Sequence, residues 1–363
     1  MNHLFTYSNQ DFVADLYRAK KDAAGTVPTS SNFDTVLKAG WTDRMSRGLF
    51  RYHLGDLQTR ILPGRRCYVA QLNIQRGLQR RKPQEILSIR QQFNATQFNF
   101  NKINPREVIF EMAKRPGHCA ASAENERSCE PCRMLVLVNV SPLEFGHCLF
   151  VPEPSRCLPQ ILTRFAIRTG IESVLLSADP GFRVGFNSLG AFASVNHLHL
   201  HGYYLNHELH VEWMTAKPLV PERGFFRLAE FPAGFLFYTE ADDVEKVAGA
   251  ISQVTDFLVD ANIAHNLFFT RGCSPYEVED ENEHTPKRGV RIIVWPRKSC
   301  FGAKEGSAFN VALCELAGHL PFKNRDDFDH MTEKDVMDVV QGYLLPNEEL
   351  LKLQQQLTAH LTD

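Results

Sequence analysis

Three histidines alternate with two leucines over residues 197–201: His197, His199 and His201 are separated by Leu198 and Leu200. In an extended strand, alternate side chains lie on the same face. We therefore expect the three imidazoles to share one face and the two leucines to pack into a core. Imidazole can bind a metal, and its unprotonated nitrogen can also attack phosphorus to form a covalent intermediate. A functionally silent strand is the third interpretation.

The residues before the histidines favour the nucleophile. Residues 182–187 predict a strand that ends at Asn187, residues 188–191 predict a turn of small residues, and Ser194 lies three positions before the first histidine. Backbone N–H groups of such a turn, together with a hydroxyl, can hold phosphate oxygens beside an imidazole. The pattern therefore indicates attack on a phosphate more than metal binding.

The histidine stretch resembles the histidine triad superfamily of nucleotidyl hydrolases and transferases, and residues 137–152 resemble the strand–turn–strand that precedes the triad there. Residues 98–103, 182–205 and 312–320 together are similar to the GDP-D-glucose phosphorylase family. That family is related to plant GDP-L-galactose phosphorylase and, more distantly, to galactose-1-phosphate uridylyltransferase. The resemblance covers about residues 50–327.

This resemblance implies a nucleotidyltransferase that converts GDP-D-glucose and inorganic phosphate to GDP and glucose 1-phosphate without a cofactor. It implies His199 as the nucleophile of a covalent guanylyl-histidine intermediate. His197 and His201 would orient the nucleophile, donate to phosphate oxygens or assist the leaving group. The plant relatives and the uridylyltransferases have glutamine at the third triad position, whereas this chain has His201, as the simple hydrolases do. Water therefore stays open as a competing acceptor.

The resemblance and the need to bind phosphate together predict substrate-binding residues. Asn187 and Ser194 lie where the superfamily contacts ribose and phosphate, and Asn139 lies in the resembling stretch upstream. Phosphate binding requires cations or many donors. Arg183, on the strand before the turn, and Lys298, in the second half, are our candidate cations. Other candidates are Lys102, Arg297 and Lys304, and we interpret the basic run at 76–82 as a solvated loop.

A second cluster contains His118, Cys119, Cys129 and Cys132 in one loop. Zinc requires four ligands, which usually come from two such pairs, and this loop has one complete Cys-x-x-Cys pair. We favour incidental loop cysteines and predict no metal site.

Composition limits the class of protein. The chain has 363 residues, 44% hydrophobic and 23% charged, with a formal net charge of −2. These values are typical of a globular protein and predict no nucleic-acid or membrane partner. The nine cysteines are scattered, and the N-terminus has no basic segment followed by an apolar run. We therefore expect reduced thiols and a cytoplasmic location. Nothing in the sequence indicates an oligomeric state.

The alternation of strand and helix patterns predicts an α+β fold: a histidine-triad-like antiparallel sheet with packed helices, built from two half-units. Within it, apolar residues at helical spacing predict two helices over residues 33–58, and alternation predicts a strand over residues 98–102. Residues 1–32 predict a flexible N-terminal arm, 33–206 a catalytic half, and 207–363 a degenerate half without a triad. By analogy, the uridylyltransferase relatives are built in this way. The alternative functions are a dinucleoside polyphosphate phosphorylase or hydrolase, and a nucleotide-binding protein without turnover.

Overall fold

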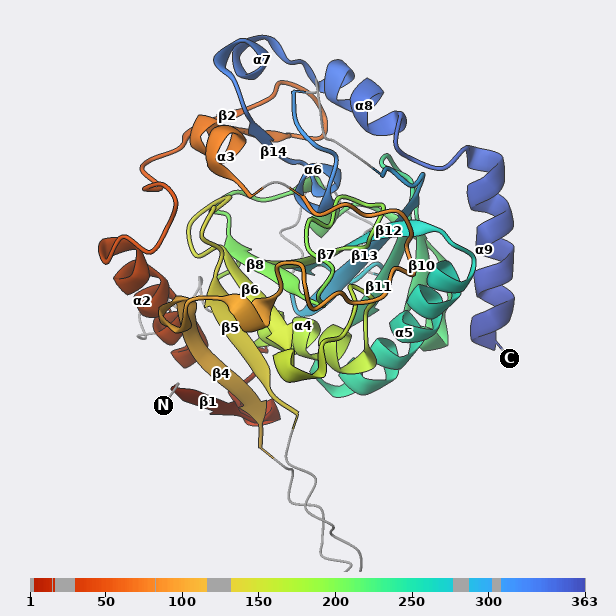
Figure 1. The fold of residues 1–363 in the computed structure, drawn as a ribbon. Helices are drawn as coiled ribbons and strands as arrows, with labels where there is room; N and C mark the ends of the chain where they lie inside the picture. The colour runs from red at the N-terminus through yellow and green to blue at the C-terminus, as the bar shows by residue number, and fades with distance from the viewer. Residues whose placement is uncertain are drawn as a thin grey trace, which may run out of the picture.

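The computed structural model describes residues 3–14, 16, 30–81, 83–115, 132–276, 287–301 and 308–362. Its centre is an 11-stranded sheet (Figure 1). In order across the sheet the strands are β1 (Leu4–Tyr7), β4 (Val108–Lys114), β5 (Met134–Val138), β6 (Cys148–Pro152), β8 (Leu200–Tyr204), β7 (Phe182–Asn187), β12 (Ala264–Gly272), β13 (Gly289–Arg297), β11 (Phe235–Thr239), β10 (Phe225–Leu228) and β9 (Ala216–Val220).

The sheet consists of two halves with the same chain path. One half runs β4, β5, β6, helix α4 (Arg164–Leu176), β7, β8, and the other runs β9, β10, β11, helix α5 (Val244–Asp260), β12, β13. In each half the last strand lies between the third and the fourth, and the halves join where β7 pairs antiparallel with β12. The predicted α+β fold with two half-units is therefore confirmed. The boundary at residues 206 and 207 stays a prediction.

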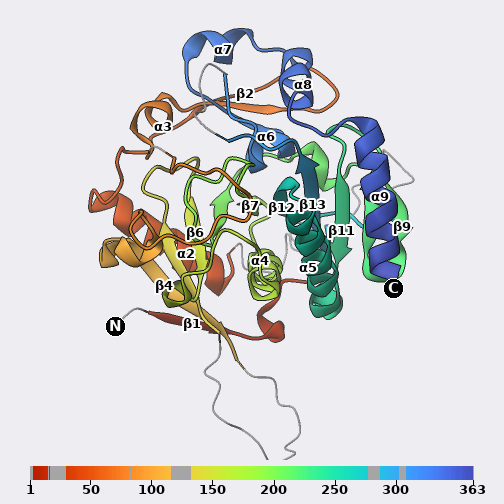
Figure 2. The same ribbon diagram turned by 45° about the vertical axis from the view of Figure 1, so that its right-hand side comes forward.

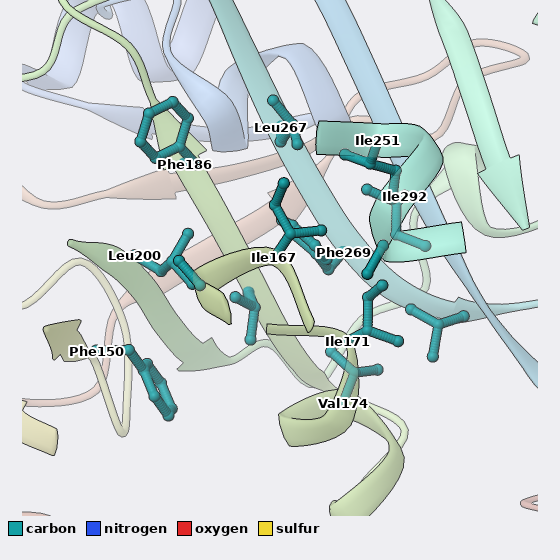
Figure 3. Packing of buried hydrophobic residues seen from close by; sticks show 14 of the residues in the cluster. Phe150, Ile167, Ile171, Val174, Phe186, Leu200, Ile251, Leu267, Phe269 and Ile292 are labelled. Atoms are coloured by element: carbon teal, nitrogen blue, oxygen red, sulfur yellow. The ribbon is translucent and has the colours of Figure 1, made fainter. Parts of the chain in front are cut away.

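The main core lies between one face of this sheet and helices α4 and α5 (Figure 3). Ile167, Ile171 and Val174 recur along α4 at helical spacing and are fully buried. They face Phe269 of β12 and other sheet residues. Burial of each such side chain contributes about 1.5–3 kcal/mol. The helices thus hold the sheet rigid on the side opposite the small layer described next.

A 3-stranded sheet forms this additional layer, at the top of the views in Figures 1 and 2. Its strands are β14 (His319–Phe322), β3 (Val69–Leu72) and β2 (Gln58–Ile61), and β14 pairs parallel with β3. The surrounding helices are α3 (Ile74–Gln79), α6 (Leu313–Ala317), α7 (Arg325–His330) and α8 (Glu333–Gln341). Because β3 and β14 are parallel, their carboxyl ends lie at the same edge.

The N-terminal segment differs from the predicted flexible arm at residues 1–32. Residues 4–7 form β1, which pairs parallel with β4 at the edge of the main sheet. Phe5 and Tyr7 are buried and alternate with exposed positions. This alternation is only four residues long and stands among polar residues, so it gave no signal in the sequence. Part of the arm is therefore an ordered edge strand.

Two further segments differ from the pattern-based predictions. Residues 33–58 predicted two helices, but the structure has one, α2 (Asn32–Ser46). Residues 98–102 predicted a strand but form a short 3-10 helix, η2 (Phe100–Lys102), because the Asn99 side chain accepts a hydrogen bond from the N–H of Asn101 at 3.1 Å. A C-terminal helix, α9 (Asn347–Thr362), packs against α5. Among the described residues, no helix is both long and apolar enough to cross a membrane.

Candidate active site

The histidine row lies at the start of β8, in the first half of the sheet. The strand begins at Leu200, so His201 is within the ladder while His197 and His199 lie in the segment just before it. Leu198 and Leu200 are fully buried in the core, as predicted. The rings of His199 and His201 have centroids 5.0 Å apart. The imidazoles are therefore close neighbours, although only one lies in regular strand.

Hydrogen bonding holds His199 in one tautomer. Its Nδ1–H donates to the carbonyl oxygen of His197 at 2.8 Å, which leaves the lone pair on Nε2. Burial lowers the pKa of His199 to about 4, so the ring is neutral near pH 7. The Gln160 side chain accepts from the His199 N–H at 2.9 Å and donates to its carbonyl at 3.1 Å. A neutral, fixed imidazole with an unprotonated Nε2 is the form that attacks phosphorus.

A fourth histidine, His147, orients His201. The N–H of Leu143 donates to His147 Nδ1 at 2.8 Å, and burial holds the pKa of His147 well below its usual value, so its single proton is on Nε2. That Nε2 lies 3.1 Å from His201 Nδ1. His147 therefore donates to His201, whose own proton is placed on Nε2. This tautomer makes His201 a hydrogen-bond donor toward a ligand.

His197 is buried beside His199 and carries its proton on Nε2. Its Nδ1 accepts from the N–H of Phe100 at 3.0 Å. Burial lowers the pKa of His197 to about 4, while the backbone of Pro154 favours the protonated ring, so the neutral imidazole keeps its single proton on Nε2. Within the described part of the chain this Nε2 has no hydrogen bond of good geometry, and His197 is not among the residues that line the pocket described next.

A pocket opens next to the histidines, with an empty volume of about 770 Å³ that includes open solvent at its mouth. Three parts of the chain line it: the triad region with Asn187, Phe192, Ser194, His201 and Tyr203; the α3 region with Asn73, Arg76, Gly77, Arg80, Leu143 and His147; and the C-terminal region with Asn310, Ala312, Leu313, Cys314, Glu315, Pro321 and Lys323. His199 is 3% exposed and is not itself among the lining residues, but its ring centroid lies 5.0 Å from that of the lining residue His201.

Asn187 and Ser194 both line this pocket, where the sequence placed substrate contacts. The Asn187 oxygen accepts from Asn266 Nδ2 at 2.6 Å and from the N–H of Leu313 at 3.0 Å. Because the oxygen is engaged, its Nδ2 group is the part that can donate to a ligand. The predicted turn is present, and Gly190 takes the φ of +75° that favours glycine there.

Two backbone donors of the turn are already engaged. The N–H groups of Ala191 and Ala193 donate to the carbonyl oxygen of Ser188 at 3.0 and 3.3 Å. These two N–H groups close the turn itself and are therefore not free to hold a phosphate oxygen.

Three predicted substrate contacts lie outside the pocket lining. Arg183 is 1% exposed and forms an ion pair with Glu212 at 2.5 Å, because that stretch of β7 runs away from the pocket into a buried ionic cluster. Lys298 is exposed and donates to the Gly342 carbonyl at 3.3 Å. Asn139 lies behind His147, and its side chain caps the turn at Ser141. The structure does not bring any of the three to the ligand side.

The pocket contains cations that our interpretation of the sequence missed. Arg76 and Arg80, assigned above to a solvated loop, line the pocket together with Lys323. Their spacing of four residues, one helical turn, was the available signal, since it places two arginines on one face. Lys323 had no such signal, because it reaches the pocket only through the pairing of β14 with β3.

The cysteine cluster falls mostly outside the described residues. His118, Cys119 and Cys129 belong to the segment 116–131, and the described Cys132 is exposed. Among the described residues, no group of three or more His, Cys, Asp or Glu side chains could hold a metal ion. The three histidines of residues 197–201 therefore do not form such a metal-binding group.

Stability should fall steeply as the pH drops below about 6.5. Burial lowers the pKa of His197, His199 and His265 to about 4 and that of His319 to about 3, while His147 is held well below its usual value. Between pH 6.5 and 4 the unfolded chain therefore binds more protons than the folded chain, and folding loses free energy as pH falls.

Urea unfolding measured between pH 7.5 and 5 tests this dependence. We expect little change above pH 7 and a slope steeper than about 1.4 kcal/mol per pH unit near pH 5.5, the value for one titrating group. A shallower slope would mean that the buried histidines titrate normally in the folded protein.

Family models and curated relatives match this chain over nearly its whole length, and they name the same family. Residues 32–203 match the family model described as "GDPGP1-like, N-terminal domain", and residues 214–363 match "GDPGP1-like, C-terminal domain". The chain is 58% identical over 354 residues to GDP-D-glucose phosphorylase 1 of Danio rerio, covering 98% of this chain and 97% of that protein. It is 49% identical to the Homo sapiens protein of the same name, covering 98% and 91%.

More distant relatives extend the comparison. GDP-L-galactose phosphorylase 1 of Arabidopsis thaliana is 27% identical, covering 84% of this chain and 69% of that protein. Among solved structures, yeast Ap4A phosphorylase Apa2 superposes with a TM-score of 0.56 at 14% identity, covering 87% of this chain and 98% of that chain. At this identity the likeness shows the shared fold alone.

Proposed function

Because this chain belongs to the GDPGP1-like family of GDP-D-glucose phosphorylases, we propose that it catalyses the phosphorolysis of GDP-D-glucose to GDP and glucose 1-phosphate. The observation that carries this mechanism is the state of His199. It is neutral, its Nδ1–H is held by the His197 carbonyl, and its Nε2 carries the lone pair. A nucleophile with these properties needs no separate base.

In the first step, Nε2 of His199 attacks the phosphorus next to guanosine. The P–N bond forms as the bond to the bridging oxygen breaks, and glucose 1-phosphate leaves with that oxygen and the electron pair. The imidazole becomes positively charged, and the His197 carbonyl, which already accepts the Nδ1–H, stabilises this charge. The guanylyl group is then held on the enzyme.

The flanking histidines supply hydrogen-bond donors in this step. His197 carries its proton on Nε2, and His201 is held by His147 in the tautomer that also carries its proton on Nε2. Both can donate to the non-bridging oxygens of the phosphoryl group, where negative charge develops. Asn187 and Ser194, which line the pocket, are the proposed substrate contacts nearby.

In the second step, an oxygen of inorganic phosphate attacks the same phosphorus. The P–N bond breaks, GDP leaves, and the electron pair returns to His199 Nε2. The reaction uses no metal or cofactor in this scheme. The cytoplasmic location expected from the sequence remains part of the proposal, supported by the free thiols of the seven described cysteines.

Trapping of the intermediate tests the proposal. The protein is incubated with GDP-glucose labelled in the phosphate next to guanosine, without inorganic phosphate. We expect acid-labile label on the protein that is discharged as GDP when phosphate is added. No label with GDP-glucose but label with a dinucleoside polyphosphate would favour the alternative substrate. No label with either, despite tight binding of GDP, would favour a nucleotide-binding protein without turnover.

A further inference from the structure

One part of the pocket lining is positively charged, and we call it the cationic wall. Arg76, Arg80 and Lys323 line it together with one carboxylate, Glu315. Three cations and one anion leave a net charge of +2. A phosphate monoester carries about −1.5 to −2 at neutral pH, so the charges match. The same pocket is lined by His147 and His201, so the cationic wall and the histidines face one cavity.

The fold holds these cations in place from two distant parts of the chain. Asn73 caps α3 by accepting from the N–H of Arg76 at 3.0 Å, and its Nδ2 donates to the Leu143 carbonyl at 3.2 Å. Arg76 also donates to the Ser141 carbonyl. Arg76 lies within α3, and Arg80 is the residue that caps its C-terminal end, one turn later. The helix is thus anchored to the loop that also positions His147.

Lys323 reaches the same wall because it directly follows β14. The parallel pairing of β14 with β3 places Lys323 beside α3, and a Cβ added at Gly77 would lie 3.2 Å from Lys323 Cβ. The absence of a side chain at Gly77 therefore permits the close approach. Lys323 Nζ donates to Asn310 Oδ1 at 3.2 Å, and the carboxylates of Glu315 and Asp327 favour its charged form.

The cations repel one another in the absence of a ligand. Burial and the neighbouring Arg76 lower the pKa of Arg80 to about 10, and burial together with Arg80 lowers the pKa of Lys323. Glu315 opposes both shifts, but its Oε2 already accepts from the N–H of Ala312 at 2.9 Å, at the start of α6. Clustered, partly desolvated cations facing a cavity are stabilised by a bound polyanion.

We propose that Arg76, Arg80 and Lys323 form the subsite for the phosphate monoester in both half-reactions. This inference rests on the proposed function. In the first half-reaction the subsite holds the sugar-bearing phosphate as glucose 1-phosphate departs. In the second half-reaction it holds inorganic phosphate for attack on the guanylyl-histidine. By concentrating phosphate next to the intermediate, it favours phosphorolysis over hydrolysis by water.

The test separates the two half-reactions in Arg80→Gln and Lys323→Met. The labelling rate with GDP-glucose and the discharge rate with inorganic phosphate are measured by rapid quenching. The ratio of GDP, the product of phosphorolysis, to GMP, the product of hydrolysis, is measured at steady state. We expect full labelling amplitude, a KM for phosphate raised about 10- to 100-fold, and a larger fraction of GMP. Arg80→Lys should recover part of the affinity for phosphate.

A matched control comes from Arg325→Gln, which removes an exposed cation of α7 two residues after Lys323 and should change none of these values. Slower labelling and slower discharge together support one shared subsite. Normal discharge with an unchanged KM for phosphate overturns the inference while labelling still upholds the function. Absence of label on the unmodified protein instead overturns the function itself. Thermal unfolding of each variant identifies any that lose activity by failing to fold.

Discussion

Substitution of His199 by alanine is expected to lower kcat by about 10⁴-fold or more and to abolish protein labelling by GDP-glucose. The reason is the tautomer: Nε2 of His199 carries the attacking lone pair, and neither flanking histidine offers an equivalent one. His197 Nδ1 accepts from the Phe100 N–H, and His201 Nδ1 accepts from His147. Affinity for GDP, measured by calorimetry, should change only a few-fold.

His265 provides a matched control for this substitution. It is as buried as His199, its Nδ1 likewise bonds a carbonyl two residues earlier, and burial lowers its pKa to the same value of about 4. It lies on β12, in the second half of the sheet, and not in the histidine row. His265→Ala and His199→Ala should therefore lose similar stability, about 1–3 kcal/mol, while only the latter prevents labelling. Labelling that persists in His199→Ala would move the covalent bond to another residue.

Two substitutions of His147 should separate its effects on catalysis and on stability. Asparagine can place its oxygen near the position of Nδ1, and glutamine can place its amide nitrogen near the position of Nε2. His147→Asn keeps the acceptor for Leu143 but loses the donor to His201, so we expect kcat to fall about 10²-fold with little change in Tm. His147→Gln keeps the donor, so kcat should fall less than about 10-fold.

The stability of the two variants should follow the opposite order. In His147→Gln the buried N–H of Leu143 loses its acceptor, which costs about 1–3 kcal/mol in urea unfolding at pH 7.5. If kcat instead falls in step with stability in both variants, His147 contributes packing alone. The unmodified protein and both variants are compared at saturating GDP-glucose and phosphate, so that binding does not enter the comparison.

The sequence predicted the features that depend on local order. Alternation placed Leu198 and Leu200 in the core, and the helical spacing of α4 and α5 placed their apolar faces on the sheet. The family resemblance pointed to Asn187 and Ser194 as substrate contacts; both line the pocket, and their contact with substrate stays a prediction. The buried faces were predicted correctly because they rest on neighbours within a few residues, whose geometry follows from the period of one strand or helix.

Features that depend on pairing between distant segments were missed. Arg76 and Arg80 read as a solvated loop because no local pattern shows that β14, about 250 residues later, closes a wall beside them. Residues 98–102 read as a strand because alternation did not reveal that Asn99 caps a turn whose Phe100 N–H holds His197. Arg183 was assigned to phosphate because its partner Glu212 lies on a different segment.

Because β3 pairs with β14, the nucleophile and the cationic wall are built by different segments of the chain. The nucleophile and its tautomer are set by residues 139–201, whereas the cationic wall comes from α3 and the end of β14. Under the subsite proposed above, substitutions in the wall should change the binding of the acceptor and the leaving group without altering the tautomer of the nucleophile. A lineage can diverge in acceptor while conserving its intermediate, and an engineer can randomise the two segments at residues 76–80 and 321–323 with the triad untouched.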